Sequence, residues 1–415
     1  MHWFSLVFLA ALALATATRL WLALRHIRHV GANRGAVPAE FADRIPLAAH
    51  QKAAEYNIAK SRVGVAETLV AAALTLAFTL GGGLQWLSAA WERAFQPSGY
   101  AHGIALIVSV VVISSAVDLP FSLYRTFVVE ARFGFNRMSL RLFVLDMIKM
   151  ALIGALVGIP LAFVVLWLMA KTGQYWWLAV WLVWAAFNLL VATLYPTLIA
   201  PLFNKFSPLE DAGLRGRIEA LLAKCGFRAK GLFVMDGSKR SSHGNAYFTG
   251  FGTAKCIVFF DTLVSRLAPQ EVEAVLAHEL GHFSRHHVWK RMGVASAVSL
   301  ALLALLGWLM NQDWFYAGLG VHSHSTATAL ILFFLIAPAF AFVLQPLASL
   351  YSRRHEFEAD RYAARYADAG DLVRALVKLY EDNAATLTPD PLHSAFYDSH
   401  PPAPVRIARL QSLNA

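Results

Sequence analysis

The stretch ATALILFFLIAPAFAFVLQPLASL, residues 327–350, contains no charged side chain and decides the class of fold. An α-helix needs about 20 predominantly apolar residues to cross a bilayer, and this stretch is long enough to do so. The whole chain shares its character, because 58% of its 415 residues are apolar and only 15% are charged. These proportions exclude an ordinary soluble domain and predict a mainly α, polytopic membrane protein.

Further stretches of the chain are also apolar enough and long enough to span a membrane. They are residues 3–24, 63–90, 101–124, 150–170, 175–195 and 291–310. The first could be read as a signal peptide with Ala15-Thr16-Ala17 as its cleavage site, but no Lys or Arg precedes its apolar run. We therefore expect seven retained transmembrane helices.

The basic residues, which give a net charge of +10, follow the membrane topology. They gather in the loops at 25–62 and 125–141, whereas the alternate loops carry few. The positive-inside rule places the two basic loops and the C-terminus in the cytoplasm. A nucleic-acid partner is not expected, because these residues flank membrane spans rather than line one soluble face. Cys225 and Cys256 fall on the reducing, cytoplasmic side, so we expect no disulfide between them.

Several polar residues interrupt the predicted spans or their ends, and such groups are costly against lipid. We expect each either to pair with a neighbouring helix or to face an interior cavity. These residues are Glu67, Asp118, Asp146, Lys149 and Asn188.

Residues 205–290 are more polar and predict a small α/β unit between the fifth and sixth spans. An amphipathic helix is expected first, and short β-branched or aromatic runs punctuated by Gly then predict strands. Pro269 and the acidic residues that follow it open another helix, which we expect to run on towards the sixth span. The first helix covers 214–225, and the strands cover 231–235, 246–251 and 256–260.

The helix that opens at Pro269 contains His278-Glu279-Leu280-Gly281-His282, the most specific signal in the chain. Its i, i+4 spacing places His278 and His282 on one face, where both imidazoles can bind a single Zn²⁺. Glu279 lies one step round the helix, where it can accept a proton from water at the site and deliver it to a leaving amine. The pattern therefore predicts a zinc peptidase with Glu279 as general base.

A catalytic zinc site of this kind needs a third protein ligand. His286 lies eight residues beyond His278, or about 12 Å along a helix, which is too far for both to bind one ion. We expect His286 and His287 to be solvated residues at the membrane boundary.

The better candidate for the third ligand is in Arg353-Arg354-His355-Glu356-Phe357-Glu358-Ala359-Asp360, after the seventh span. In a helix Glu356 and Asp360 share a face, so Glu356 can bind zinc while Asp360 holds a ligand imidazole, and Glu358 points away. The distribution of basic loops puts this segment on the same side of the membrane as HELGH.

These motifs and several other segments resemble the type I CAAX prenyl proteases, which are multi-spanning zinc endopeptidases. The resemblance also rests on segments 130–136 (EARFGFN), 201–206 (PLFNKF), 238–248 (SKRSSHGNAYF) and 399–402 (SHPP). It implies seven helices around a water-filled chamber, closed on the cytoplasmic side by the zinc site.

The same resemblance implies roles for residues outside the zinc motif. His400 and Arg406 would contact the substrate carbonyl oxygen or its oxyanion. An edge strand would bind an extended substrate by main-chain hydrogen bonds, and its residues would be Asn245, Ala246, Tyr247 and Phe248. Simpler interpretations are that Asn245 is a turn residue and that His400 belongs to a turn before Pro-Pro.

The sequence thus predicts an integral-membrane zinc metalloendopeptidase with one Zn²⁺ and a peptide or protein substrate, with the need for prenylation left open. The expected location is a bacterial inner membrane, or the endoplasmic reticulum if the chain is eukaryotic. One alternative is a heat-shock-type quality-control zinc protease, which would have fewer spans. Another is a non-catalytic membrane chamber or transporter with structural zinc, and the presence of Glu279 argues against it.

The predicted organisation has four segments along the chain. They are 1–204 with five transmembrane helices, 205–290 with the α/β peptidase unit, 291–351 with helices six and seven, and 352–415 as a C-terminal cytoplasmic segment.

Overall fold

The computed structural model describes residues 2–249 and 256–413. Within them, seven helical segments are long and apolar enough to cross a membrane, which confirms the prediction of a mainly α chain with seven spans. The segments are α1 (Trp3–Asn33), α2 (Leu47–Phe78), α4 (Tyr100–Tyr124) with the π-helical η2 (Arg125–Glu130), α5 (Leu140–Lys171), α6 (Trp176–Leu194) with its flanking turns, α10 (His287–Leu309), and α12 (Thr326–Ala341) with α13 (Gln345–Tyr366).

The boundaries predicted for the second span, 63–90, are wrong at both ends. Helix α2 ends at Phe78 with Thr79 as its C-cap, and three consecutive glycines follow at 81–83, of which Gly82 has a positive φ of 76° and caps the start of the next helix. The remaining apolar residues form a separate short helix, α3 (Gly83–Trp91). At the other end α2 begins at Leu47, because its first turns carry polar residues that an apolar window does not detect.

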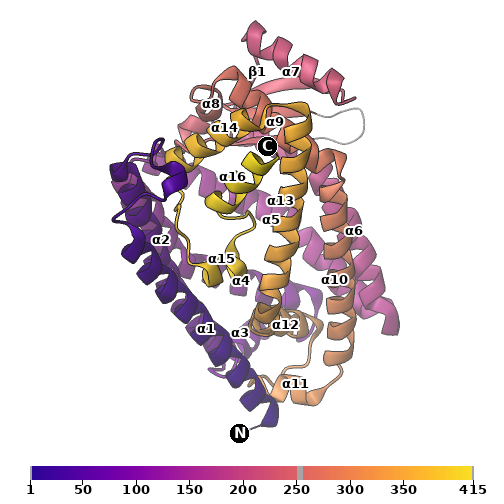
Figure 1. The fold of residues 1–415 in the computed structure, drawn as a ribbon. Helices are drawn as coiled ribbons and strands as arrows, with labels where there is room; N and C mark the ends of the chain where they lie inside the picture. The colour runs from indigo at the N-terminus through magenta and orange to yellow at the C-terminus, as the bar shows by residue number, and fades with distance from the viewer. Residues whose placement is uncertain (1, 250–255, 414–415) are drawn as a thin grey trace.

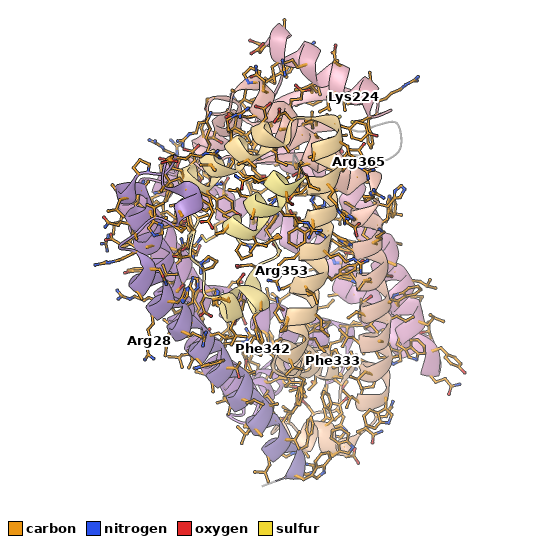
Figure 2. All side chains as sticks on the ribbon, viewed as in Figure 1. Arg28, Lys224, Phe333, Phe342, Arg353 and Arg365 are labelled. Atoms are coloured by element: carbon orange, nitrogen blue, oxygen red, sulfur yellow. The ribbon has the colours of Figure 1, made fainter. Side chains whose placement is uncertain are left out.

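The seventh span extends well beyond the predicted 327–350. The turn η7 (Phe342–Leu344) joins α12 to α13, and α13 continues to Tyr366. Side chains change along this segment from Phe333 and Phe342 at one end to Arg353 and Arg365 towards the other (Figure 2). The segment 353–360 is therefore a rigid continuation of a membrane helix.

The more polar end of the molecule contains a four-stranded sheet of order β1-β2-β4-β3. Strands β2 (Gly231–Met235) and β4 (Cys256–Phe260) are parallel, while β1 (Phe206–Pro208) and β3 (Ala246–Thr249) pair antiparallel at the two edges. The three-residue strand β1 was not predicted from the sequence. The strand predicted over 246–251 begins as expected, and its residues 250 and 251 lie outside the described residues.

Helices from distant parts of the chain gather around this sheet (Figure 1). They are α7 (Ala212–Lys224), α8 (Asp261–Val264), α9 (Pro269–Ser284), α14 (Ala369–Asp382) and α16 (Ala403–Ser412), while α15 (Pro391–Tyr397) packs against α13 and α1, and α11 (Asp313–Ala317) follows α10. One apolar core joins α7, α9, α14 and α16, and it includes Phe41 and Ile45 from the loop after α1. A separate core fills the membrane bundle. The predicted domain boundaries stay predictions.

Most of the polar residues within the spans have partners. Asp146 accepts hydrogen bonds from Arg240 at 2.8 and 3.1 Å, and Glu67 pairs with Arg125. Lys149 donates to the Leu202 carbonyl at 2.8 Å, and Asn188 donates to a carbonyl of its own helix. For Asp118, the described residues provide no hydrogen bond or ion pair. Pairing thus accounts for the charged groups Glu67, Asp146 and Lys149.

Helix α9 crosses α13 at a very short distance. A Cβ atom placed on Gly281 would lie 2.9 Å from the Ala359 Cα and 3.0 Å from both the Ala359 carbonyl oxygen and the Tyr362 Cβ. Two of these three atoms belong to backbone, so the contact cannot be relieved by a side-chain rotation. Only glycine fits at this crossing.

We therefore expect Gly281→Ala to lower thermal stability, because overpacking of this kind typically costs about 1–3 kcal/mol. Gly216→Ala is the matched control, since nothing lies within 4 Å of a Cβ at that exposed position of α7. Thermal unfolding of both purified variants measures the difference. A Gly281→Ala protein that melts with the wild type would contradict the requirement for glycine.

Candidate metal centre

Three potential metal ligands meet where α9 crosses α13. The His278 Nε2 lies 3.2 Å from the His282 Nε2. One Glu356 carboxylate oxygen lies 3.4 Å from His278 Nε2, and the other lies 3.3 Å from His282 Nε2. The structure thus brings together the three residues that the sequence singled out as ligands.

These distances suit one tetrahedral zinc ion. With metal–ligand bonds of about 2.0–2.1 Å, two ligands of a tetrahedral site are separated by about 3.3 Å. The Glu356 Oε2 is buried and has no hydrogen-bond partner among the described residues, which is costly unless a cation completes the site. The donor set of two imidazoles and a carboxylate is also that of a catalytic zinc site.

Behind His278, two buried charged residues orient the ring. The Asp360 Oδ1 lies 2.8 Å from the His278 Nδ1, and Arg406 donates to both oxygens of Asp360 at 2.8 and 2.7 Å. Burial and the Arg406 charge oppose protonation of His278, but its contacts with Asp360 and Glu356 outweigh them and raise its pKa to about 9. A divalent cation would take the place of that proton, because an imidazole ligand must be neutral.

Behind His282 lies a second chain of contacts, and here two sequence expectations are wrong. His287 is buried, not solvated, and its Nδ1 lies 3.0 Å from the His282 Nδ1. Its Nε2 lies 3.1 Å from the Glu358 carboxylate, so Glu358 does not point away from the site. The His287 ring also stacks on His355 at 4.0 Å between centroids.

The helix break before His287 explains why sequence reasoning missed this residue. The expectation assumed one continuous helix from Pro269 into the sixth span. Instead α9 ends at Ser284, and His286 has a positive φ of 56° at the start of α10. His286 is left exposed, whereas the changed direction turns His287 inward. Histidine adopts positive φ more often than most residues, but such cases are still uncommon, so the residue type alone does not predict this break.

The remaining predicted catalytic residues differ in the burial and the contacts of their side chains. Glu279 is half-buried, and its carboxylate has no hydrogen-bond or ion-pair partner in residues 2–249 and 256–413. The His400 Nε2 lies 3.4 Å from Glu356, and its side chain is 61% exposed. Arg406, by contrast, is buried, and its observed contacts are with Asp360, with His278 and, at 3.9 Å, with Glu356. Its contact with a substrate oxygen stays a prediction.

The four residues predicted to bind substrate lie along β3, beside α9. Asn245 is exposed and precedes the strand, and Ala246 faces the core. Tyr247 reaches Met235 with its hydroxyl, and Phe248 approaches Phe283 of α9 at 6.3 Å between ring centroids. Because β3 is an edge strand, one side of its backbone has no strand partner among the residues of the described sheet.

Two family models match most of the chain. Residues 26–205 match the family described as CAAX prenyl protease N-terminal, five membrane helices. Residues 208–414 match Peptidase family M48.

Individual relatives and a solved structure agree with these matches. The chain is 39% identical to a CAAX prenyl protease 1 homolog of Arabidopsis thaliana over 74% of this chain and 72% of the relative. It is 30% identical to a CAAX prenyl protease 1 homolog of Homo sapiens over 98% of this chain and 96% of the relative. The crystal structure of S. mikatae Ste24p superimposes with a TM-score of 0.92 at 30% identity, covering 98% of this chain and 99% of that one.

The contacts behind His282 generate a test of zinc affinity. Glu358→Gln should weaken zinc binding by about 10-fold or more, because the groups that orient a ligand imidazole typically contribute 10–100-fold to metal affinity. Competition with a chelator measures this directly. Arg354→Gln is the matched control. Arg354 lies 3.5 Å from the Glu358 carboxylate, but the chain of contacts to His282 runs through Glu358 and His287 and does not include Arg354. Equal zinc retention in both variants would show that His287 and Glu358 do not support the site.

Proposed function

The chain belongs to peptidase family M48, in its CAAX prenyl protease branch, and from that membership we propose how its residues carry out the work of an integral-membrane zinc metalloendopeptidase. His278, His282 and Glu356 hold one zinc ion. The spacing of 3.2–3.4 Å between their donor atoms supports this assignment. Seven spans and the match to the five-helix N-terminal family argue against the quality-control type of protease.

Glu279 is the general base of the proposed mechanism. A zinc ion at this site would polarise the scissile carbonyl and lower the pKa of water. Glu279 lies one residue from a proposed ligand, and its carboxylate has no hydrogen-bond or ion-pair partner among the described residues. It can therefore take a proton from the attacking water. It then donates this proton to the leaving amine. This free carboxylate, one residue from His278 on the helix that carries two of the proposed ligands, is the observation that carries the proposal.

His400 stabilises the oxygen that becomes negative during the attack. Its exposed imidazole lies next to Glu356, on the open side of the ligands, where it can donate a hydrogen bond. Asp360 and Arg406 act from the buried side and hold His278 in position. Arg406 is therefore proposed as a positioning residue.

The substrate is proposed to be a peptide that adds to the free edge of β3. Asn245, Ala246, Tyr247 and Phe248 offer main-chain groups for this pairing, and β3 lies against the helix that carries the zinc motif. The relatives are named CAAX prenyl proteases, so C-terminal prenylated peptides are the first class to test. The distribution of the basic loops supports a cytoplasmic location for this end of the molecule. We propose a bacterial inner membrane, or the endoplasmic reticulum if the chain is eukaryotic, and localisation of the tagged chain tests this.

Glu279→Gln should keep the fold and the zinc but lose nearly all turnover, because only the proton acceptor is removed. The measurement is cleavage of a farnesylated CAAX peptide and its unprenylated twin, followed by mass spectrometry, with zinc content determined in parallel. Glu273→Gln on the same helix is the control and should stay active. Substantial proteolysis by zinc-loaded Glu279→Gln would refute the assignment. Cleavage of neither peptide by the zinc-loaded wild type would exclude the prenyl-peptide substrate and leave the peptidase.

His400→Ala should lower kcat by about 10²-fold, since a donor to a developing oxyanion acts mainly in the transition state. Zinc content and KM should change much less. The exposed His286→Ala is the control. If His400 belonged only to a turn, its removal would lower the melting temperature, with activity falling only in proportion to the folded fraction. Near-normal kcat in a folded, zinc-loaded variant would remove His400 from the mechanism.

A further inference from the structure

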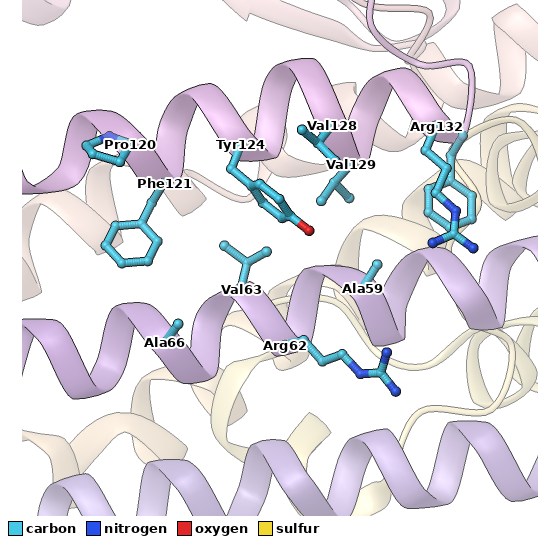
Figure 3. Close-up of a pocket in the computed structure, with 11 residues that line it drawn as sticks. Ala59, Arg62, Val63, Ala66, Pro120, Phe121, Tyr124, Val128, Val129 and Arg132 are labelled. Atoms are coloured by element: carbon cyan, nitrogen blue, oxygen red, sulfur yellow. The ribbon is translucent and has the colours of Figure 1, made fainter.

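A groove with a volume of about 490 Å³ lies between α2 and the continuous segment of α4 and η2 (Figure 3). Such a volume is within the range of small-molecule sites, roughly 300–1,000 Å³. Its walls are mainly apolar and include Ala59, Val63, Ala66, Pro120, Phe121 and Val128.

The groove follows from the residues that form its two sides. On α2, the alanines 59 and 66 leave room where larger side chains would fill the space. On α4, Pro120 lacks a backbone N–H and cannot make the regular helical hydrogen bond. The π-helical η2 follows directly, and such segments in helices are frequently associated with functional sites.

Two arginines, Arg62 and Arg132, are among the residues that line the groove. Both guanidinium groups lie towards the end of the groove where Ala59 lies, with Arg132 on the η2 side and Arg62 on α2 (Figure 3). In the described part of the chain neither has a carboxylate partner, whereas the nearby Arg125 is paired with Glu67. The groove therefore combines an apolar body with two guanidinium groups whose charge no protein group neutralises.

The arginine end lies at the membrane boundary. Arg132 lies two residues after Glu130, the last residue of the span. Arg62 lies five residues after Asn57, which donates to the Ala384 carbonyl at 2.8 Å in the segment after α14. From there the groove runs along α2 and α4 into their apolar parts. A ligand that fits must therefore have an anionic head at the boundary and an apolar tail within the bilayer.

We propose that this groove binds one anionic phospholipid, whose phosphate lies between Arg62 and Arg132 and whose acyl chain lies along Val63, Ala66 and Phe121. Guanidinium groups bind phosphate with two parallel hydrogen bonds, so a pair of them selects a headgroup without a compensating positive charge. Anionic lipids are also the lipids that basic pockets between transmembrane helices bind on the cytoplasmic side.

The bound lipid would contact both α2 and η2, two elements that already contact each other beside the groove. Tyr56 of α2 donates to Glu130 of η2 at 2.6 Å, and the groove lies beside this contact. A lipid that contacts both walls would hold α2 against η2 and stabilise the folded protein. Arginines that only extend towards water would give no preference for one lipid over another.

The test is native mass spectrometry of the purified full chain after exchange into equal amounts of phosphatidylglycerol and phosphatidylcholine. The wild type should retain phosphatidylglycerol in preference by about 10-fold or more, as expected from two arginines near the headgroup. The double variant Arg62→Gln, Arg132→Gln should lose most of this preference. Arg28→Gln with Arg44→Gln changes the net charge equally at exposed positions outside the groove and should keep it.

A second variant tests the apolar part while both arginines are kept. Ala66→Trp should fill the groove and lower retention of phosphatidylglycerol, with folding checked by thermal unfolding. No lipid preference in the wild type would overturn the proposal, as would a double variant that keeps the preference. Unchanged retention in folded Ala66→Trp, or release of the lipid by excess inorganic phosphate, would overturn it as well.

Discussion

The direct backbone contact between α9 and α13 is the constraint on which the metal centre depends. Glycine at position 281 lets the Ala359 backbone approach to the distance at which Glu356 on α13 reaches both histidines of α9. A Cβ at 281 would meet the Ala359 backbone at 2.9–3.0 Å, so α9 and α13 would have to shift at the crossing that carries Glu356. The glycine of the HELGH motif is therefore a packing requirement of the proposed metal centre, alongside the two histidines of the same motif.

The membrane bundle positions both sides of this contact. Helix α13 continues directly from α12, and α9 leads into α10 after a single break, so the ligands stand at the ends of two membrane helices. The segment before β3 is attached in the same way. Arg240 donates to Asp146 in α5 and to Asn204 at 2.7 Å, and His243 lies 3.6 Å from Glu130. Segments that resemble the prenyl proteases thus meet each other where the sheet joins the spans.

Sequence reasoning recovered the features that depend on local periodicity. The spacing of His278, His282, Glu356 and Asp360 places them correctly because each group lies within one regular helix. Sequence reasoning failed where a helix begins or ends at a position that the residue types do not predict. The left-handed His286 redirects His287 towards the site, and the glycines after Phe78 shorten a span whose apolar run continues. Contacts across the fold, such as that of Glu358 with His287, were beyond the reach of a single sequence.

The pairing of Arg406 with Asp360 explains how a second buried carboxylate can stand beside the metal ligands without becoming one. Both Asp360 oxygens are engaged by Arg406, and the Oδ1 also contacts the His278 Nδ1, so this carboxylate is directed at the ring's far nitrogen. Without the guanidinium, two carboxylates would lie unbalanced in a buried site, which is unfavourable. The arginine therefore leaves Glu356 as the carboxylate that faces both histidines, which is the arrangement that the proposed zinc site requires.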